Sequence, residues 1–552
     1  MAYSKIKKIH VAEAGTLSTL LPADEAEELE VLILSGYLNS QDFDGVLDDL
    51  CTFWSMEFDE DDDPVFDWGE APKLRVLDMG ECELVDSTTL PEFGYYVQLD
   101  KIVLPKNTEY LTYESAIQES FLREIVLPQG LRSLDGVSNC ERLENIEIPE
   151  SVENLGMYAL SGCPKLKELH IPKNVKTIQG GFSAGNDLIK KITVSEENQH
   201  FVSIDGVVYT KDLKILIAYP GGSGRKAYKV PEGTEELGAG AFMESDIDEI
   251  ILPESLKVIG ESCFFGCQKL RKLIMPDSVT TLGDRSLAYC GSLEQLHLST
   301  SLKAIVESTF NSCVSLKRLD VPGSVKTIEA SAIVWNEEGF EEIFLHEGVE
   351  SIIPKGNKVS YMLAHESVLR KIYIASTVRN IMPGIFAHCV NLEKMKISEE
   401  NPYFKIIDGA IYTKDGKELV TVPNRNREHF SIAEGTEIIA EACFWEFAKL
   451  KMIHIPSTLR IIEHRAFDMC SSLREITLPE TLEEIETRAF DHCDSLVTIR
   501  LFAKQPPKNT GDEDSNLMGI SMHEVDIFVP EESVELYLSD PKWSKWNIKA
   551  MD

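Results

Sequence analysis

The sequence predicts a repeat solenoid of α/β type: a right-handed coil with a parallel β-sheet on its concave face, short helices or 3₁₀ turns on the other face, and β-hairpin insertions. Two observations predict it. A pattern of 23 residues recurs along most of the chain. In addition, 552 residues with 43% hydrophobic content are too many for one ordinary globular core, unless the chain is a repeat array.

The repeat pattern predicts each element of one coil. Residues 143–166 and 473–496 show it clearly, and the shared form is L-x-x-[LIM]-x-[ILMV]-P-x-[ST]-[VL]-x-x-[IL]-x-x-x-[AS]-[FL]-x-x-C-x-x-L. The alternation in L-x-x-I-x-I is typical of a half-buried strand, which the proline ends because it has no N–H for the ladder. The segment V-x-x-I predicts a second extended piece, and A-F-x-x-C-x-x-L predicts a short helix or 3₁₀ turn.

Cysteine follows the register of the repeat. Eight of the twelve cysteines occupy one slot: Cys140, Cys163, Cys267, Cys290, Cys313, Cys389, Cys470 and Cys493. Cys263 and Cys443 occupy the slot of a small residue, and Phe447 replaces cysteine in one rung. We expect a column of reduced, buried thiols, because the clustered C-x-x-C pairs of a zinc site are absent. Stacked neighbours leave a few disulfides open as an alternative.

These motifs resemble the BspA-like leucine-rich repeats, also called the Treponema pallidum type. The core L-x-x-[LI]-x-[IL]-P-x-[ST]-[VL]-x-x-[IL]-x-x-x-A-F-x-x-C recurs from about Leu122 to Leu496. An insertion is written twice, as IDGVVYTKD over 204–212 and IDGAIYTKD over 407–415, each after Ser-Glu-Glu-Asn. The Asp-Gly turn signals predict one or two β-hairpins that leave the solenoid at each insertion.

The two ends of the chain resemble the same kind of protein. Residues 14–21 and 34–42 are similar to the leading cap of surface leucine-rich-repeat lipoproteins from gut Bacteroidales, and residues 527–546 resemble a closing strand and helix. The resemblance implies adhesion, host-protein binding or accessory surface functions. It implies no shared catalytic motif.

The pattern divides the chain into four parts. We expect an N-terminal cap over 1–71, with a helix over 42–54 whose apolar residues share one face. Degenerate first repeats follow over 72–121. The leucine-rich repeats occupy 122–501, with insertions at about 195–235 and 398–436, and a C-terminal cap occupies 502–552.

The acidic balance of the chain excludes some partners. With 54 basic and 92 acidic residues the formal charge is −38, so nucleic acid and anionic membranes would be repelled. The start of the chain lacks the apolar region of a signal peptide. The resemblance implies the extracellular side of the outer membrane, with the leader removed and a lipid anchor that is not visible in this sequence; a cytoplasmic protein is the alternative.

One acidic segment has the spacing of calcium ligands. Its carboxylates fall at positions 1, 3, 5, 9 and 12 of a calcium loop: Asp59, Asp61, Asp63, Asp67 and Glu70. Position 6 is Pro64, where the loop needs glycine, and the flanks predict no helix pair. A solvated loop outside the cap is the favoured interpretation, with no metal and no cofactor.

The solvent-facing column of the predicted sheet is the candidate binding site. In each strand the residue between the last two core positions points to solvent. Over part of the array this column is apolar and aromatic: Ile251, Ile274, His297, Asp320, Phe344 and Tyr373. Exposed apolar runs often mark partner sites. The alternative is ordinary β-propensity on a flat sheet, or cover from the insertions.

The function expected from these features is binding and not catalysis. The chain has no G-x-S-x-G, H-E-x-x-H or glycine-rich phosphate loop, so no catalytic residue is assigned. Three functions remain open: a surface adhesin or lipoprotein that binds a protein or glycan, an accessory subunit of an outer-membrane nutrient-uptake complex that contacts a transporter, and a structural surface protein without a specific small-molecule ligand.

Overall fold

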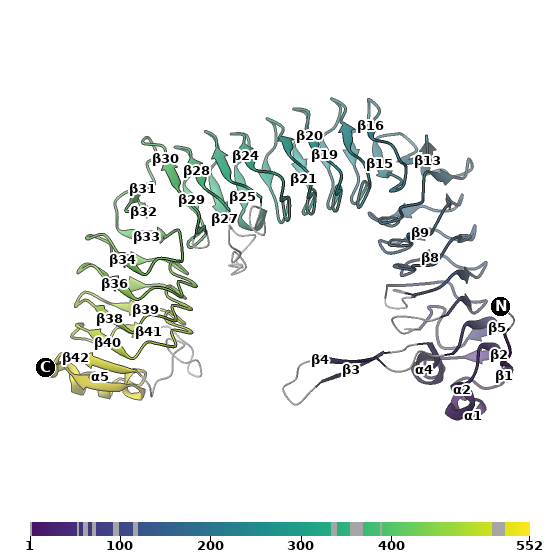
Figure 1. The fold of residues 1–552 in the computed structure, drawn as a ribbon, viewed down its shortest axis with the longest axis horizontal. Coiled ribbons are helices and arrows are strands. Elements are labelled where there is room, and N and C mark those ends of the chain that lie inside the picture. The colour runs from purple at the N-terminus through teal and green to yellow at the C-terminus, as the bar shows by residue number, and fades with distance from the viewer. Residues whose placement is uncertain are drawn as a thin grey trace. The chain divides into compact units, whose positions relative to one another are not determined.

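The computed structural model describes residues 3–51, 54–58, 64–68, 73–91, 99–113, 117, 120–332, 339–353, 368–386, 389–509 and 525–551. The chain forms two compact units, Met1–Leu293 and Glu294–Asp552, and each is described by itself. Within each unit the short strands of successive repeats lie side by side in parallel sheets (Figure 1). The predicted solenoid of stacked repeats is therefore confirmed.

The N-terminal part of the first unit is built like the repeats that follow. One parallel sheet has the order β1 (Ile6–Val11), β2 (Val31–Leu38), β5 (Val76–Leu84), β6 (Lys101–Val103) and β7 (Glu124–Val126). Leu32, Leu77 and Ile102 lie fully buried on its inner face. The segment expected as a cap thus supplies two strands to the same sheet as the degenerate repeats.

Short helices and one hairpin complete this N-terminal region. The helices are α1 (Leu17–Leu20), α2 (Ala23–Ala26), α3 (Ser40–Asp42), the π-helical η1 (Phe43–Leu47) and α4 (Asp48–Cys51). The helix expected over 42–54 is split into α3, η1 and α4, with non-helical backbone at Gly45. Its apolar residues Phe43, Leu47 and Leu50 are buried. Trp54 instead begins β3 (Trp54–Phe58), which pairs antiparallel with β4 (Pro64–Trp68).

Each regular repeat contributes two short strands to two separate parallel sheets. The first strands are β10 (Leu169–Ile171), β12 (Ile192–Val194), β16 (Ala227–Lys229), β18 (Glu249–Ile251) and β20 (Lys272–Ile274) in the first unit, and β22 (Gln295–His297), β24 (Arg318–Val321), β26 (Glu342–Leu345), β28 (Lys371–Ile374), β30 (Lys394–Ile397), β34 (His429–Ser431), β36 (Met452–His454), β38 (Glu475–Leu478) and β40 (Thr498–Leu501) in the second. The second strands are β8 (Ser133–Leu134), β9 (Asn154–Leu155), β11 (Thr177–Ile178), β17 (Glu236–Leu237), β19 (Val258–Ile259), β21 (Thr281–Leu282), β23 (Ala304–Ile305), β25 (Thr327–Glu329), β27 (Ser351–Ile353), β29 (Asn380–Ile381), β35 (Ile438–Ile439), β37 (Ile461–Ile462), β39 (Glu484–Ile485) and β41 (Lys508–Asn509).

The segment that closes each repeat consists of consecutive turns. Its alternate backbone N–H groups donate to the next repeat, as Phe242 does to Cys263 O at 2.8 Å and Phe264 does to Ser286 O at 2.8 Å. This geometry places a residue of almost any type in the left-handed region, for example Arg285 at φ 55° and Tyr289 at φ 59°. The spacing predicted a helix or 3₁₀ turn; inter-repeat hydrogen bonds produce turns because they replace the bonds within a helix. The one 3₁₀ helix that the described residues of the array contain is η2 (Ala330–Ala332).

The cysteine column is buried and joined to this turn ladder. All twelve cysteines are buried thiols, as expected. Cys267, Cys470 and Cys493 each donate their S–H to the carbonyl of the repeat before, with S to O distances of 3.0, 3.2 and 3.1 Å. Asn186 occupies the same slot in another repeat and donates to Leu160 O at 2.8 Å. In these repeats the slot holds a side chain that donates to the repeat before, whereas in one rung the apolar ring of Phe447 fills it.

Both insertions form a three-stranded antiparallel meander that stays attached to the solenoid. The strands are β13 (Phe201–Ile204), β14 (Val207–Thr210) and β15 (Ile215–Ala218) in the first insertion, and β31 (Phe404–Ile407), β32 (Ala410–Thr413) and β33 (Glu418–Thr421) in the second. The expectation that they leave the solenoid is wrong. β15 pairs in parallel with β17, and β33 pairs in parallel with β35, so each meander becomes the first rung of a second-strand sheet.

The C-terminal segment closes the second unit with a strand, a helix and a final strand. The elements are β42 (Asp526–Val529), η3 (Glu531–Ser533), α5 (Val534–Ser539), η4 (Trp543–Lys545) and β43 (Asn547–Ala550). Two buried aromatic side chains tie them to the last repeat, since Tyr537 donates to Ala503 O at 2.8 Å and Trp543 donates to Pro507 O at 2.9 Å.

Candidate functional site

Two members of the predicted column lie on the first unit. Ile251 and Ile274 are 46% and 51% exposed at the ends of the neighbouring strands β18 and β20. Both line a small depression of about 210 Å³, whose rim carries Glu249, Glu254 and Lys272. Two aliphatic side chains that are half exposed provide an apolar contact area but no specific geometry.

The other members lie on the second unit, where the structure brings three of them together. The strand register places Asp320 beside Phe344, and Phe344 beside Tyr373. The two rings stack with centroids 4.4 Å apart and planes 8° from parallel. His297 is exposed on β22, and its ring has no hydrogen-bond or ion-pair partner among the described residues.

A cationic side chain lies over each of the two stacked rings. The Arg318 guanidinium carbon lies 4.0 Å from the Phe344 centroid, and Lys394 Nζ lies 5.6 Å from the Tyr373 centroid, both within cation–π range. We call Arg318, Phe344, Tyr373 and Lys394 the aromatic–cation stack. The two cations of the stack were not predicted from the sequence, although Arg318 is two residues before Asp320 and a strand places such residues on one face.

Acidic side chains fix the arginine of the stack but leave lysines available. Arg318 donates to both carboxylate oxygens of Asp320 at 2.6 and 2.9 Å, and this contact is the main reason that the pKa of Asp320 lies below its ordinary value. Lys371 pairs with Glu342. No ion pair of Lys394 or Lys396 is found among the described residues. The face is therefore locally basic in a strongly acidic chain.

The acidic segment with calcium spacing falls mostly outside the described residues. Asp59, Asp61, Asp63 and Glu70 are not described, and Asp67 lies in β4. The flanking residues form two antiparallel strands, whereas the calcium loop considered above connects two helices.

A different cluster of metal-ligating residues lies on the turns of the last repeats. One ligand atom each of Asp468, Asp491 and His492 lies within 4.8 Å of the others. His492 Nδ1 is 3.2 Å from Asp468 Oδ1 and 3.4 Å from Asp491 Oδ1, while Arg465 and Arg488 face the other carboxylate oxygens at 3.7 and 3.9 Å. The five side chains balance one another's charges, so this arrangement is satisfied as an ionic cluster.

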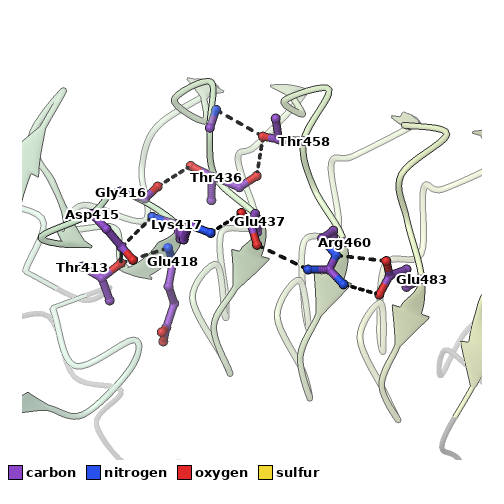
Figure 2. A network of polar contacts seen from close by, with 11 residues as sticks. Thr413, Asp415, Gly416, Lys417, Glu418, Thr436, Glu437, Thr458, Arg460 and Glu483 are labelled. Carbon is purple, nitrogen blue, oxygen red and sulfur yellow. Dashed lines mark hydrogen bonds and ion pairs between the residues drawn. The ribbon is translucent and has the colours of Figure 1, made fainter.

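Charged side chains of successive rungs alternate in sign next to the second insertion (Figure 2). Glu437 accepts from Lys417 Nζ at 2.7 Å and pairs with Arg460 at 3.5 Å, and Arg460 donates twice to Glu483 at 2.9 and 3.0 Å. Lys214, Glu235 and Lys257 form the same ladder beside the first insertion. Each exposed ion pair contributes little to the free energy of unfolding. Their role is to match charges between rungs.

A group of four glutamates lies beside this ladder. Desolvation, with the nearby carboxylates of Glu418, Glu486 and Glu441, raises the pKa of Glu463 to about 7. Glu463 accepts one hydrogen bond from the backbone of Glu441 at 2.9 Å. This bond lowers the pKa of Glu463, but by less than desolvation raises it. This carboxyl group is therefore only partly ionised near neutral pH.

The raised pKa of Glu463 predicts a pH-dependent cost to stability. The folded state holds this proton up to about pH 7, whereas the unfolded chain releases it near 4.5, so stability falls as pH rises between these values. Glu463→Gln should therefore raise stability at pH 8 by on the order of 2 kcal/mol and leave it nearly unchanged at pH 4.5. Thermal midpoints across this range test it, with exposed Glu480→Gln as control. A gain of equal size at both pH values would contradict the expectation.

Among the described residues, no helix has the length and apolar character needed to cross a membrane. The model of the BspA type leucine rich repeat region matches in six copies, over residues 91–204, 235–359, 350–425 and 422–510. The chain belongs to the BspA-type leucine-rich repeat family. Its repeats match well over half of the sequence, and the predicted resemblance is confirmed.

Solved structures with a similar fold come from several bacteria. A leucine rich cell surface protein from Faecalibacterium prausnitzii is 20% identical, with 71% of this chain and 83% of that chain covered and a TM-score of 0.36. A leucine-rich repeat protein from Bacteroides ovatus is 18% identical, with 91% and 99% covered and a TM-score of 0.32. One from T. pallidum is 25% identical, with 33% and 86% covered and a TM-score of 0.27. Curated protein sequences give no significant match.

Proposed function

We propose that this chain is a non-enzymatic binding protein of the bacterial cell surface, and that a protein partner docks on the aromatic–cation stack. The stack itself carries the proposal. Aromatic rings and arginine are the residue types enriched at the energetic centres of protein interfaces. Here they lie on a rigid sheet, because the strand register that holds Phe344 and Tyr373 is fixed by β24–β28.

The geometry favours a partner with acidic groups. Phe344 has Arg318 on one face and Tyr373 on the other, and Lys394 lies over the far side of Tyr373. Covered ring faces leave the ring edges for a partner, and an aromatic edge carries partial positive charge. Lys394 and Lys396 add full charges beside these edges. A partner carboxylate could pair with Lys394 or Lys396, whereas Arg318 is already paired with Asp320.

The cell-surface assignment rests on the family resemblance of the repeats and of both ends of the chain. A lipid-anchored protein of Bacteroidales follows from the same resemblance, and its outer-membrane placement is part of the proposal. Two specific roles fit this placement: an adhesin with a host partner, and an accessory subunit that contacts a transporter.

Capture from the envelope of the native host, with the full chain as bait, tests the proposal. Phe344→Glu with Tyr373→Glu should lower the affinity for the captured partner at least about tenfold, because each substitution removes a stacked ring and adds like charge. The matched control is Phe528→Glu, since Phe528 lies in the same column position between Arg500 and Lys549 of the C-terminal cap. Binding to the control should remain within about twofold.

Several outcomes would overturn the proposal. Equal capture by the stack variant and the native chain would show that the partner docks elsewhere. Equal loss in the stack variant and the Phe528 control would show a nonspecific charge effect. Capture of a glycan instead of a protein would show that the proposed class of partner, a protein, is wrong. Circular dichroism and the thermal midpoint of each variant separate a lost contact from a lost fold.

A further inference from the structure

A cleft on the first unit lies where the first insertion rejoins the solenoid. It has a volume of about 880 Å³. The turn segments of successive repeats and the glycine stretch at the end of the insertion line it, through Asp187, Gly221, Glu244, Asp246, Phe265 and Tyr289 among others. This cleft is distinct from the aromatic–cation stack, which lies on the second unit.

Of the three carboxylates that line the cleft, only that of Asp246 has a cationic partner among the described residues. Asp246 faces Lys269 at 3.7 Å, but no ion pair or hydrogen bond of the Glu244 or Asp187 carboxylates is found among the described residues. Glu244 lies so close over Gly185 that a Cβ there would be 2.6 Å from its Oε2. Desolvation and the Asp187 carboxylate raise the pKa of Glu244.

The second unit contains a matching cleft beside the second insertion. Its volume is about 600 Å³, and Glu446, Ser471 and His492 occupy the repeat positions of Glu244, Gln268 and Tyr289. Glu244 and Glu446 share a left-handed backbone, at φ 55° and 58°, and each donates its N–H to the next repeat, at 2.7 and 2.9 Å. The two clefts are therefore the same structural position in two copies.

In the second cleft, the glutamate at this position binds a guanidinium group of the chain itself. The last turn of the second insertion supplies Arg425, whose guanidinium pairs with Glu446. The first insertion has Gly221-Gly222-Ser223-Gly224 at this turn. Its next arginine, Arg225, matches Arg427, because each donates to the aspartate carbonyl of the Asp-Gly turn and lies over an aromatic ring. The first cleft thus has the glutamate but no internal guanidinium.

Aromatic side chains make the first cleft better suited to a cation than the second. The Phe265 and Tyr289 rings lie 5.0 Å apart and tilted by 53°, and Tyr289 is 43% exposed. The equivalent residues of the second cleft are Asp468 and His492. A guanidinium binds carboxylates through its planar fork and stacks on aromatic faces, so it can use both walls of the first cleft.

We propose that the first cleft binds a guanidinium cation, the side chain of an arginine on a peptide or protein partner, between Glu244 with Asp187 and the rings of Phe265 and Tyr289. The bound group would occupy the place that Arg425 occupies in the second cleft. Free arginine presents the same guanidinium, and the test below separates this source from a peptide.

Isothermal titration of the full chain with N-acetyl-arginine-amide tests the proposal. The neutral isostere N-acetyl-citrulline-amide should bind at least about tenfold more weakly, because it cannot form the charged pair. L-arginine binding as tightly as the blocked form would identify a free amino acid as the source; tighter binding of the blocked form would identify a peptide. Equal binding of arginine and citrulline probes would overturn the proposal, as would no measurable heat with either.

Two variants and a matched control locate the site. Glu244→Gln should lower the affinity at least about tenfold. Ser223→Arg, which equips the first insertion with its own arginine, should also weaken binding by occupying the cleft. Glu446→Gln is the control and should leave binding unchanged. An unchanged affinity in both first-cleft variants would overturn the assignment. Because the aromatic–cation stack is on the other unit, the Phe344 and Tyr373 variants should bind the probe normally, so this test is independent of the proposed function.

Discussion

Replacing Phe467 with alanine should lower the free energy of unfolding of the second unit by about 4 kcal/mol. Phe467 is fully buried and lies between the rings of Phe444 and Phe490, with centroid distances of 5.1 and 5.2 Å and nearly parallel planes. The substitution removes both ring contacts and leaves a cavity that the rungs cannot close, because the turn ladder fixes their spacing. The midpoint of urea unfolding, followed by circular dichroism, measures the effect.

An exposed phenylalanine of the same unit provides the control for this substitution. Phe502 is 45% exposed, so Phe502→Ala should change stability by no more than about 0.5 kcal/mol. Equal shifts of the midpoint for the two variants would show that the stacked rings do not contribute to the stability of the core. A small effect of Phe467→Ala alone would show that neighbouring rungs can collapse into the cavity.

Replacing Asn401 with alanine should destabilise the same unit by roughly 4 kcal/mol, because four backbone groups, three of them in buried hydrogen bonds, lose their partner. The fully buried side chain donates to Ala375 O and Val378 O, each at 2.9 Å, and accepts from the N–H groups of Tyr403 and Phe404, each at 2.8 Å. Asn198 makes the equivalent bonds in the first insertion. Urea unfolding of the variant measures the loss.

A second variant separates the two halves of this network. Asn401→Asp keeps an acceptor for the two N–H groups but turns an oxygen toward the two carbonyls, so its destabilisation should shrink at acidic pH, where the carboxyl group can donate again. Exposed Asn380, which makes one side-chain hydrogen bond to Ser351, is the control for alanine substitution. Equal effects at positions 380 and 401 would contradict the role assigned to the buried asparagine.

The sequence predicted the parts of the fold that depend on local pattern. Strand residues such as Leu319 and Ile343 follow from alternation, and the cysteine slot follows from the 23-residue register. The turn form of the closing segment was not predictable from spacing, because hydrogen bonds to the next repeat determine it. The attachment of the insertions was missed for a similar reason, since β15 pairs with a strand some twenty residues later in the chain.

The candidate sites show the same limit. Alternation placed Phe344 and Tyr373 toward solvent, and their stacking follows from the parallel register of neighbouring strands. The contributions of Arg318 and Lys394 depend on side-chain direction across strands. The cleft beside the first insertion depends on how turns from several repeats meet. No single segment carries that information, although the two insertions differ at equivalent positions, with Ser223 in the first and Arg425 in the second.

The attachment of the two meanders also bears on how so long an array folds. Parallel rungs bring together residues about 23 positions apart, which is slow because each contact closes a loop, whereas an antiparallel hairpin forms from neighbours in microseconds. β13–β15 and β31–β33 are local hairpins that each end in an edge ready to pair in parallel with the next rung. Each meander can therefore act as a folding nucleus, from which the repeats after it assemble one by one without waiting for those before it.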